Sequence, residues 1–401
     1  MAVDAPVLLA LPADGVPELI ATPAQLRRAV AAIASGTGPV AVDAERASGF
    51  RYRQRAYLVQ LRRAGAGTTL IDPVELPSLS SLDAAIGDAE WVLHAANQDL
   101  PCLAELGLHP KRLFDTELAG RLLGDDRVAL GTMVERHLGI RLEKGFAAAD
   151  WSARPLGEEL LAYAALDVEL LIPLAAALRE ELTRTAKLDW AEQEFEAVRR
   201  APTPAPRADP WRRTSGIHGL HRRRQLAAVR ALWYARDELA AASDLAPGRV
   251  LPDAAIIAAA RANPRRFDDL LALPAFQRAR QRRQAARWMA ALQQARRLSR
   301  DQLPPISAER TRVPSRRWRD QDPQASARLA RTREALDALA AERSVLTQNL
   351  LASHIVRQLA WAPPNALDEA AVRAELAALG ARPWQIELTA RQLTAALTDA
   401  E

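Results

Sequence analysis

Two acidic residues stand two positions apart in an otherwise apolar run. Asp43 and Glu45 end the segment 40–45, whose other residues are Val and Ala. In a β-strand, residues i and i+2 share a face, so both carboxylates would project from one side of a core strand. Unpaired charges there are costly, and a bound divalent cation is a natural compensation. The alternative is that the strand ends at Val42 and that the acids lie solvated in a loop.

Three further residues could complete such a site. Asp99 follows a second apolar strand, predicted over 91–95, and begins a helical pattern. Tyr163 and Asp167 lie in an Ala- and Leu-rich helix at spacing i, i+4 and therefore share one helix face. Four carboxylates and a tyrosine suffice for a two-metal phosphoryl-transfer site. Mg²⁺ and Mn²⁺ take oxygen ligands, so no His or Cys is needed.

In this order and at these separations, the residues resemble the three motifs of the DEDD 3′→5′ exonucleases, in the variety with a tyrosine in motif three. Two further stretches resemble ribonuclease D in particular: residues 150–167 and the segment Phe114-Asp-Thr-Glu117. The three matching motifs are Asp43-x-Glu45, His94-Ala-Ala-Asn-Gln-Asp99 and Tyr163-x-x-x-Asp167.

The resemblance implies an α/β ribonuclease H-like exonuclease domain, with a mixed sheet flanked by helices, and two bound divalent metal ions, Mg²⁺ or Mn²⁺. It implies that Asp43 bridges both ions and that Glu45 and Asp167 complete the site of the ion that activates water. Asp99 would act on the second ion, chiefly through bound waters. Tyr163 would orient the attacking water.

Proline-rich segments divide the chain into domains. Residues 1–200 alternate predicted strands and helices and form the exonuclease domain, and 201–215 is a Pro-rich linker. Residues 216–300 are helical and resemble an HRDC domain, a small module of ribonuclease D and RecQ helicases. A second linker follows over 301–325, and 326–401 is expected to be a second, divergent HRDC-like domain. The segments that match the first module are Arg236-Asp-Glu-Leu-Ala240, Arg249-Val-Leu-Pro-Asp253 and Asn263-Pro-Arg-Arg-Phe267.

Within the first domain, three early strands with short turns precede strands separated by helices, which indicates a mixed sheet with helices packed on it. Asp115 is expected to cap the helix that follows it. The strands are predicted over 40–45, 56–62, 69–72, 91–95 and 113–114, and the helices over 22–35, 79–89, 100–106, 116–123, 132–138 and 157–181.

Charge is distributed unevenly along the chain. The formal net charge is +5, but residues 207–320 carry 25 Arg, no Lys and 10 acidic residues, a net charge of +15. A basic segment joined to an acidic one indicates nucleic-acid contact in the basic part; the alternative is a solvated arginine-rich helix surface. Trp151 could stack on a terminal base or pack at a domain edge. The candidate phosphate contacts are Arg222, Arg223, Arg224, Arg265 and Arg266.

Several classes of protein are disfavoured. The single cysteine, Cys102, excludes an internal disulfide and fits a reducing cytosol. No apolar run approaches the ~20 residues of a membrane helix, and the N-terminus lacks the positive leading segment of a signal peptide. No G-x-x-x-x-G-K-[ST] phosphate loop occurs, so no nucleotide cofactor is expected. We therefore expect a cytoplasmic protein that does not contact a membrane.

The sequence predicts a metal-dependent 3′→5′ exoribonuclease that releases 5′-nucleoside monophosphates. The resemblance to ribonuclease D implies RNA with a free 3′ end as the substrate, with tRNA precursors and other structured RNAs as the usual class. One alternative is a 3′→5′ DNA exonuclease of the RecQ-associated type, although the missing helicase phosphate loop and the tandem helical modules favour ribonuclease D. Another alternative is a catalytically silent nucleic-acid-binding protein. The intact set of acidic residues and Tyr163 argues against it.

Overall fold

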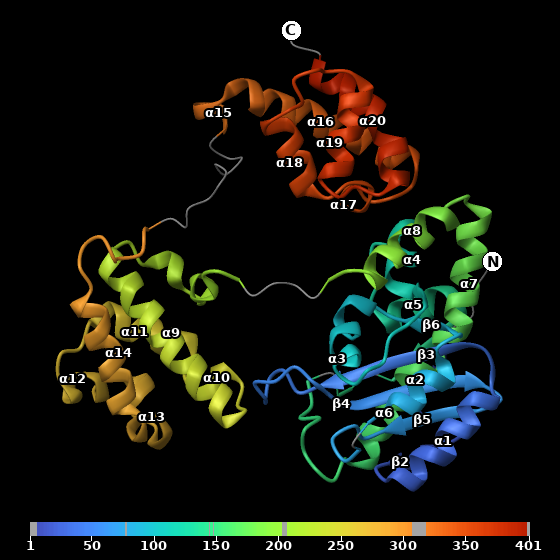
Figure 1. Cartoon of the computed structure of the whole chain (residues 1–401), viewed down its shortest axis with the longest axis horizontal. Helices are drawn as coiled ribbons and strands as arrows, with labels where there is room; N and C mark the ends of the chain where they lie inside the picture. Colours follow the sequence, from blue (N-terminus) through green and yellow to red (C-terminus); the bar gives the residue numbers. More distant parts are fainter. Residues whose placement is uncertain are drawn as a thin grey trace.

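The computed structural model describes residues 6–398 except 77, 144, 147, 203–206 and 307–317. Figure 1 shows three lobes, an α/β lobe that carries the predicted catalytic residues and two helical lobes. The residues 203–206 and 307–317, which belong to the two predicted linkers, lie outside the described part of the chain.

A six-stranded mixed sheet organises the α/β lobe, as predicted. The strands lie in the order β2-β5-β4-β3-β6-β7; β4 is antiparallel to β3 and β5, and the other neighbours are parallel. Two short strands, β1 and β8, form a separate parallel pair. The strand bounds are β1 Val7–Leu9, β2 Leu19–Ile20, β3 Thr37–Arg46, β4 Ala56–Ala64, β5 Gly67–Ile71, β6 Glu90–Leu93, β7 Arg112–Asp115 and β8 Ile140–Leu142.

Helices pack against the sheet and form two core clusters with it. Buried residues of α1, α2 and α7 join those of β3 and β6 in the largest core cluster, and α6 packs against β3, β4 and β5 over a smaller cluster that includes Leu58 and Ala165. The helix bounds are α1 Pro23–Ser35, α2 Ser80–Ile86, α3 Leu100–Glu105, α4 Thr116–Leu123, α5 Leu130–Leu138, α6 Glu158–Glu169, α7 Leu171–Arg184 and α8 Leu188–Arg199.

The single helix predicted over 157–181 is two helices, because α6 ends at Glu169 and α7 begins at Leu171. The combined stretch Glu158–Arg184 is long and apolar enough to cross a membrane by length and composition. This corrects the expectation that no apolar run approaches the length of a membrane helix. Half of its most apolar window is buried within the protein, and Val168 and Leu174 belong to the core. These are the properties of a core helix.

The second lobe is a helical module around a core that includes Leu232, Ile256 and Trp288. Trp211 is fully buried in this core although it falls inside the predicted linker 201–215. The module's helices are α9 Arg223–Ser243, α10 Pro247–Val250, α11 Asp253–Ala262, α12 Phe267–Leu271, α13 Ala279–Arg283 and α14 Ala285–Arg297.

The third lobe is a second group of helices. Trp318 is buried against Trp361, with ring centroids 4.8 Å apart, so part of the predicted linker 301–325 belongs to this lobe. Its helices are α15 Trp318–Gln321, α16 Pro323–Glu342, α17 Thr347–Leu350, α18 Ser353–Trp361, α19 Glu369–Ala378 and α20 Pro383–Thr398.

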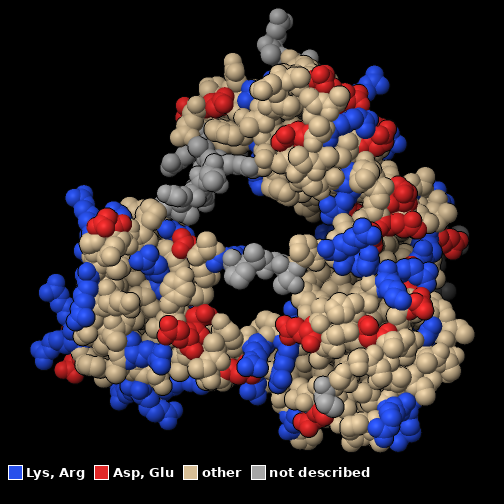
Figure 2. All heavy atoms as spheres, in the orientation of Figure 1, with Lys and Arg blue, Asp and Glu red and all other residues tan. Residues whose placement is uncertain are grey.

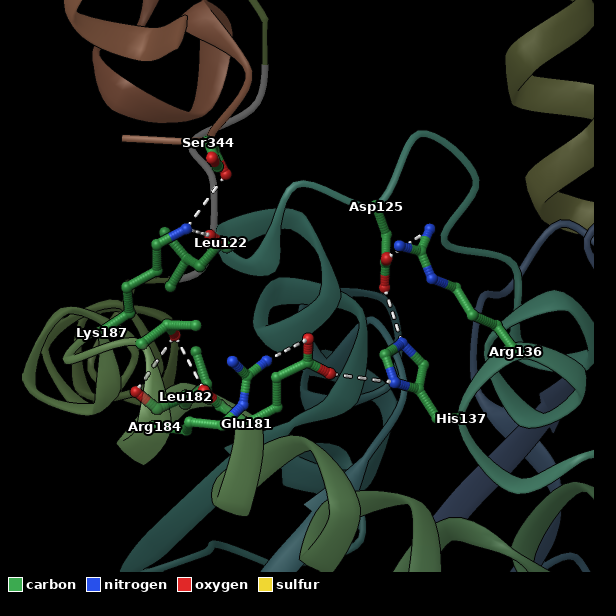
Figure 3. A network of polar contacts seen from close by, with 10 residues as sticks. Leu122, Asp125, Arg136, His137, Glu181, Leu182, Arg184, Lys187 and Ser344 are labelled. Carbon is green, nitrogen blue, oxygen red and sulfur yellow. Dashed lines mark hydrogen bonds and ion pairs between the residues drawn. The ribbon is translucent and has the colours of Figure 1, made fainter. Parts of the chain in front are cut away.

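The third lobe docks on the α/β lobe through a buried lysine and a tryptophan pair. The ammonium of Lys187 donates to the carbonyl oxygens of Leu122 at 2.8 Å and Ser344 at 3.0 Å, one on each lobe (Figure 3). Burial lowers the pKa of Lys187. The rings of Trp190 and Trp384 stack with centroids 4.8 Å apart. These contacts join the two lobes through shared buried surface, and residues of both lobes belong to the largest core cluster.

Candidate active site

The predicted carboxylates from β3 and α6 meet. One oxygen from each of Asp43, Glu45 and Asp167 lies within 4.8 Å of the other two. On β3, Asp43 pairs with Gln60 and Glu45 pairs with Leu58 of β4. Directly paired residues share a face, and Leu58 belongs to the cluster packed under α6, so the alternation of β3 directs both acids toward the helix that carries Asp167.

Asp99 reaches the site from a different element. It follows the short 3₁₀ turn Ala96–Gln98 at the start of α3, is buried, and lies 3.9 Å from the guanidinium of Arg46. Asp115 fixes this turn, because its carboxylate accepts hydrogen bonds from the backbone N–H groups of Ala95 and Ala96 at 3.1 and 2.8 Å. The same carboxylate caps α4, as predicted. Its hold on the Asp99 turn was not predicted.

The electrostatics of the cluster favour a bound cation. Burial raises the pKa of Asp43 to about 6. Burial and the charges of the neighbouring carboxylates raise the pKa of Glu45 to about 9 and that of Asp99 to about 8, and they raise the pKa of Asp167 as well. Each raised pKa means that negative charge on that carboxylate is costly in the empty site, most of all at Glu45 and Asp99. A divalent cation between the carboxylates would offset that cost.

The donor set also fits such an ion. Carboxylate oxygens are the ligands that Mg²⁺ and Mn²⁺ prefer, and three of them converge here. Gln60, which is fully buried and paired with Asp43 across the sheet, has no hydrogen-bond partner for either amide atom among the described residues. A buried amide without partners is costly, so its retention beside Asp43 points to a polar occupant of this site.

Tyr163 is held beside Asp167 by its surroundings. The centroid of its ring lies 6.1 Å from that of Phe146 and 6.4 Å from that of Trp151. Burial, the neighbouring carboxylates and a hydrogen bond with Asp167 raise the pKa of the phenol above its ordinary value. The hydroxyl is therefore a donor at neutral pH and is no general base. Trp151 is only 1% exposed, so it has no free ring face for a nucleobase, and of its two predicted roles the structure fits packing.

A cleft of about 750 Å³ contains the acidic cluster. Its wall includes Asp43, Glu45, Asp99 and Tyr163, together with the loop that follows β3, and this volume is suited to a nucleotide. His94 also lines the cleft; its Nδ1 contacts the Thr116 hydroxyl at 2.8 Å, and burial lowers its pKa to about 4. The further residues of the wall are Ala44, Arg46, Ser48, Gly49, Phe50, Ala95, Gln98, Glu117, Val128, Ala129, Ala148 and Ala149.

The predicted phosphate contacts lie on the second lobe, away from the acidic cluster. Arg222, Arg265 and Arg266 are exposed. Arg223 is half-buried and donates to the Pro304 carbonyl oxygen at 3.2 Å. Arg224 is exposed but donates to the Leu298 carbonyl oxygen at 2.6 Å, so part of the donor capacity of both residues stabilises the fold. Figure 2 shows basic side chains along the outer and lower edges of this lobe.

Three family models match the chain. A 3′–5′ exonuclease model matches residues 17–183, and an HRDC domain model matches residues 225–292. Residues 312–397 match a model described as a 3′ to 5′ exonuclease C-terminal domain. This third match does not confirm a second HRDC domain.

Curated sequences of two bacteria resemble part of this chain. Ribonuclease D from Shewanella sp. (strain ANA-3) is 35% identical over 230 residues, and that from Acidiphilium cryptum is 35% identical over 209 residues. The chain spans only 59% and 52% of the length of these curated relatives.

Two crystal structures cover nearly the whole chain. A protein from Bifidobacterium adolescentis superposes with a TM-score of 0.88 at 37% identity, covering 98% of this chain and 99% of that one. Escherichia coli RNase D, an exoribonuclease involved in structured RNA processing, superposes with a TM-score of 0.68 at 26% identity, covering 96% of this chain and 99% of that one.

Fold and site together define a class: the chain carries a 3′–5′ exonuclease domain joined to an HRDC domain. More particularly, the resemblance to ribonuclease D seen in its three motifs is confirmed by the curated ribonuclease D sequences and by the Escherichia coli RNase D structure.

Proposed function

We propose that the protein is a metal-dependent 3′→5′ exoribonuclease that hydrolyses RNA with two metal ions and releases 5′-nucleoside monophosphates. The observation that carries the proposal is the convergence of the Asp43, Glu45 and Asp167 carboxylates within 4.8 Å, in a cleft that also contains Asp99 and Tyr163. The similarity to ribonuclease D supports RNA as the substrate.

Each residue of the site would have a different role, which follows from its position in the cleft. Bound divalent ions would supply a nucleophilic water at neutral pH and would neutralise charge on the phosphoryl oxygens. Asp43, Glu45 and Asp167 would hold the ions, and ion binding would favour the ionised form of each carboxylate. Asp99 would act from the α3 side of the cleft, balanced by Arg46 at 3.9 Å. The Tyr163 hydroxyl would orient the attacking water, since its raised pKa leaves it protonated.

The substrate that we propose is RNA with a free 3′ end, with tRNA precursors and other structured RNAs as the natural class. The exposed Arg222, Arg265 and Arg266 of the HRDC domain would bind phosphates and hold the body of the RNA. A second HRDC-like module after residue 325 and a cytoplasmic location remain predictions, as do the absence of membrane contact and of a nucleotide cofactor.

Cleavage of a labelled tRNA precursor with Mn²⁺, Mg²⁺ or chelator tests the proposal. We expect stepwise shortening from the 3′ end and 5′-mononucleotide products with either ion, and none with chelator. Asp43→Ala should lose nearly all turnover while RNA binding persists, and Glu159→Ala, an exposed acid on the same helix as Asp167, should behave like the parent. Faster cleavage of matched DNA would point to a DNA exonuclease. An Asp43→Ala variant that degrades RNA at the parent rate would refute the site.

A further inference from the structure

The loop between β3 and β4, residues 47–55, borders two parts of the molecule. Ser48, Gly49 and Phe50 form part of the wall of the catalytic cleft. The same loop extends toward α10 of the HRDC domain, as Figure 1 shows. The HRDC domain therefore contacts the exonuclease domain at a segment that begins directly after the catalytic strand.

Three of these contacts involve Phe50 or its neighbour Gly49. The guanidinium of Arg249, on α10, lies 3.9 Å from the centroid of the Phe50 ring, and its Nε donates to the Gly49 carbonyl oxygen at 2.8 Å. The backbone N–H of Ala246 donates to the Phe50 carbonyl oxygen at 3.0 Å. Both the ring and the main chain of Phe50 are thus held by the HRDC domain.

Two neighbouring contacts extend this interface along the loop. The Tyr52 hydroxyl donates to the Asp237 carboxylate at 3.1 Å, and the Arg53 backbone N–H donates to the Asp244 carboxylate at 3.1 Å. Within the loop, Ser48 and Gly49 are exposed and Phe50 is half-buried. The position of the cleft wall on this side therefore depends on the HRDC domain.

Phe50 has the chemistry of a stacking platform. Apart from His94, the aromatic side chains among the described residues of the cleft wall are Phe50 and Tyr163. Tyr163 is engaged with Asp167 and two aromatic neighbours, and Phe50 packs against the core cluster under α6 and carries Arg249 over its ring. A phenyl ring binds nucleobases of any sequence by stacking. A guanidinium on the ring fixes its orientation by a cation–π contact.

We infer that Phe50 contacts a nucleobase near the 3′ end of the bound strand, and that Arg249 is a positioning residue that holds the Phe50 ring for this contact. The inference rests on the proposed function, because it requires nucleic acid in the cleft. It gives the HRDC domain a role in the catalytic cleft itself, beyond that of a remote RNA-binding surface.

Steady-state kinetics of the full chain on an RNA with a single-stranded 3′ tail test the inference. Phe50→Ala and Arg249→Ala should each raise KM about 10-fold and leave kcat within about twofold, because one stacked base is lost. Phe50→Leu, which keeps the bulk without the ring, should match Phe50→Ala, and Phe50→Tyr should restore the parent KM. Arg300→Ala serves as the control, because Arg300 is an exposed arginine that follows α14 in the second lobe. Thermal melting confirms that each variant folds.

Two further comparisons separate stacking from a structural role. The double variant of Phe50 and Arg249 should raise KM no further than Phe50→Ala alone, since Arg249 acts through the ring. RNA whose terminal nucleotides lack bases should bind the parent and Phe50→Ala equally. Additive effects, an unchanged KM in Phe50→Ala, or the same penalty on abasic RNA would overturn the inference.

Equilibrium binding of the same RNAs in chelator, followed by fluorescence anisotropy, gives the comparison without turnover. A parent that shows the Phe50-dependent and base-dependent affinity but cleaves nothing with Mn²⁺ or Mg²⁺ would refute the proposed function and retain this inference. If the parent cleaves RNA but its RNA affinity depends neither on Phe50 nor on the terminal bases, the proposed function stands and this inference is refuted.

Discussion

Removal of one carboxylate should stabilise the metal-free protein, and the effect should depend on pH. In the folded state the pKa of Glu45 is raised from 4.5 to about 9 by burial and by the neighbouring carboxylates. Above pH 4.5 the unfolded chain has lost this proton while the folded protein still binds it. The contribution of Glu45 to stability is therefore fully present below pH 4.5 and is lost as the pH rises toward 9.

The size of the effect follows from this window. Each pH unit between the two pKa values removes about 1.4 kcal/mol of unfolding free energy, so the parent should lose about 3 kcal/mol between pH 5.5 and pH 7.5 relative to Glu45→Gln, whose amide does not titrate. The Gln variant keeps the shape of the side chain. The comparison therefore reports the removal of the Glu45 charge together with the repulsion that this charge exerts on the neighbouring carboxylates.

Urea unfolding in chelator at the two pH values measures the difference, with Glu159→Gln on the exposed face of α6 as the matched control. Excess Mn²⁺ should stabilise the parent and the control more than Glu45→Gln, since only they retain the full ligand set. The reasoning fails if the parent does not lose stability relative to Glu45→Gln between pH 5.5 and pH 7.5, or if Mn²⁺ stabilises all three proteins equally.

Three other predictions concern catalysis, docking and RNA affinity. Tyr163→Phe keeps the packed ring and removes the hydroxyl, so nucleotide release should slow roughly 10- to 100-fold without vanishing; an unchanged rate would remove the hydroxyl from the mechanism. Trp384→Ala deletes the stack on Trp190 and should weaken docking of the third lobe by about 3 kcal/mol, seen in calorimetry as an earlier separate transition; a single unshifted transition would argue against this interface. RNA affinity should fall with salt, and Arg265→Ala should reduce the slope of log K against log salt by about 1; an unaltered slope would place the phosphates elsewhere.

The convergence of the candidate site residues could be predicted because local geometry determines which way their side chains point. Alternation along β3 places Asp43 and Glu45 on one face, and the i, i+4 spacing in α6 places Tyr163 beside Asp167. The order of the three motifs then assigned Asp99 to the same site. The mixed sheet was predicted for the same reason, because its central strands have strong apolar patterns.

Features that depend on tertiary contacts could not be predicted. Whether Trp151 stacks on a base or packs in the core depends on what covers it, and α6 lies over it. Arg223 and Arg224 donate hydrogen bonds to carbonyl oxygens of residues 296–304. These bonds depend on the path of a segment that is distant in the sequence. The short strands β1 and β8 have too few residues for a pattern and form because they pair with each other.

The central claim is that the acidic cluster binds divalent ions. Anomalous diffraction from crystals grown with Mn²⁺ tests it most directly. The account predicts manganese peaks within coordination distance of the Asp43, Glu45 and Asp167 carboxylates, with Asp43 shared between two ions, and their loss in Asp43→Ala. Manganese bound elsewhere in an active protein, with this cluster left without metal, would contradict it.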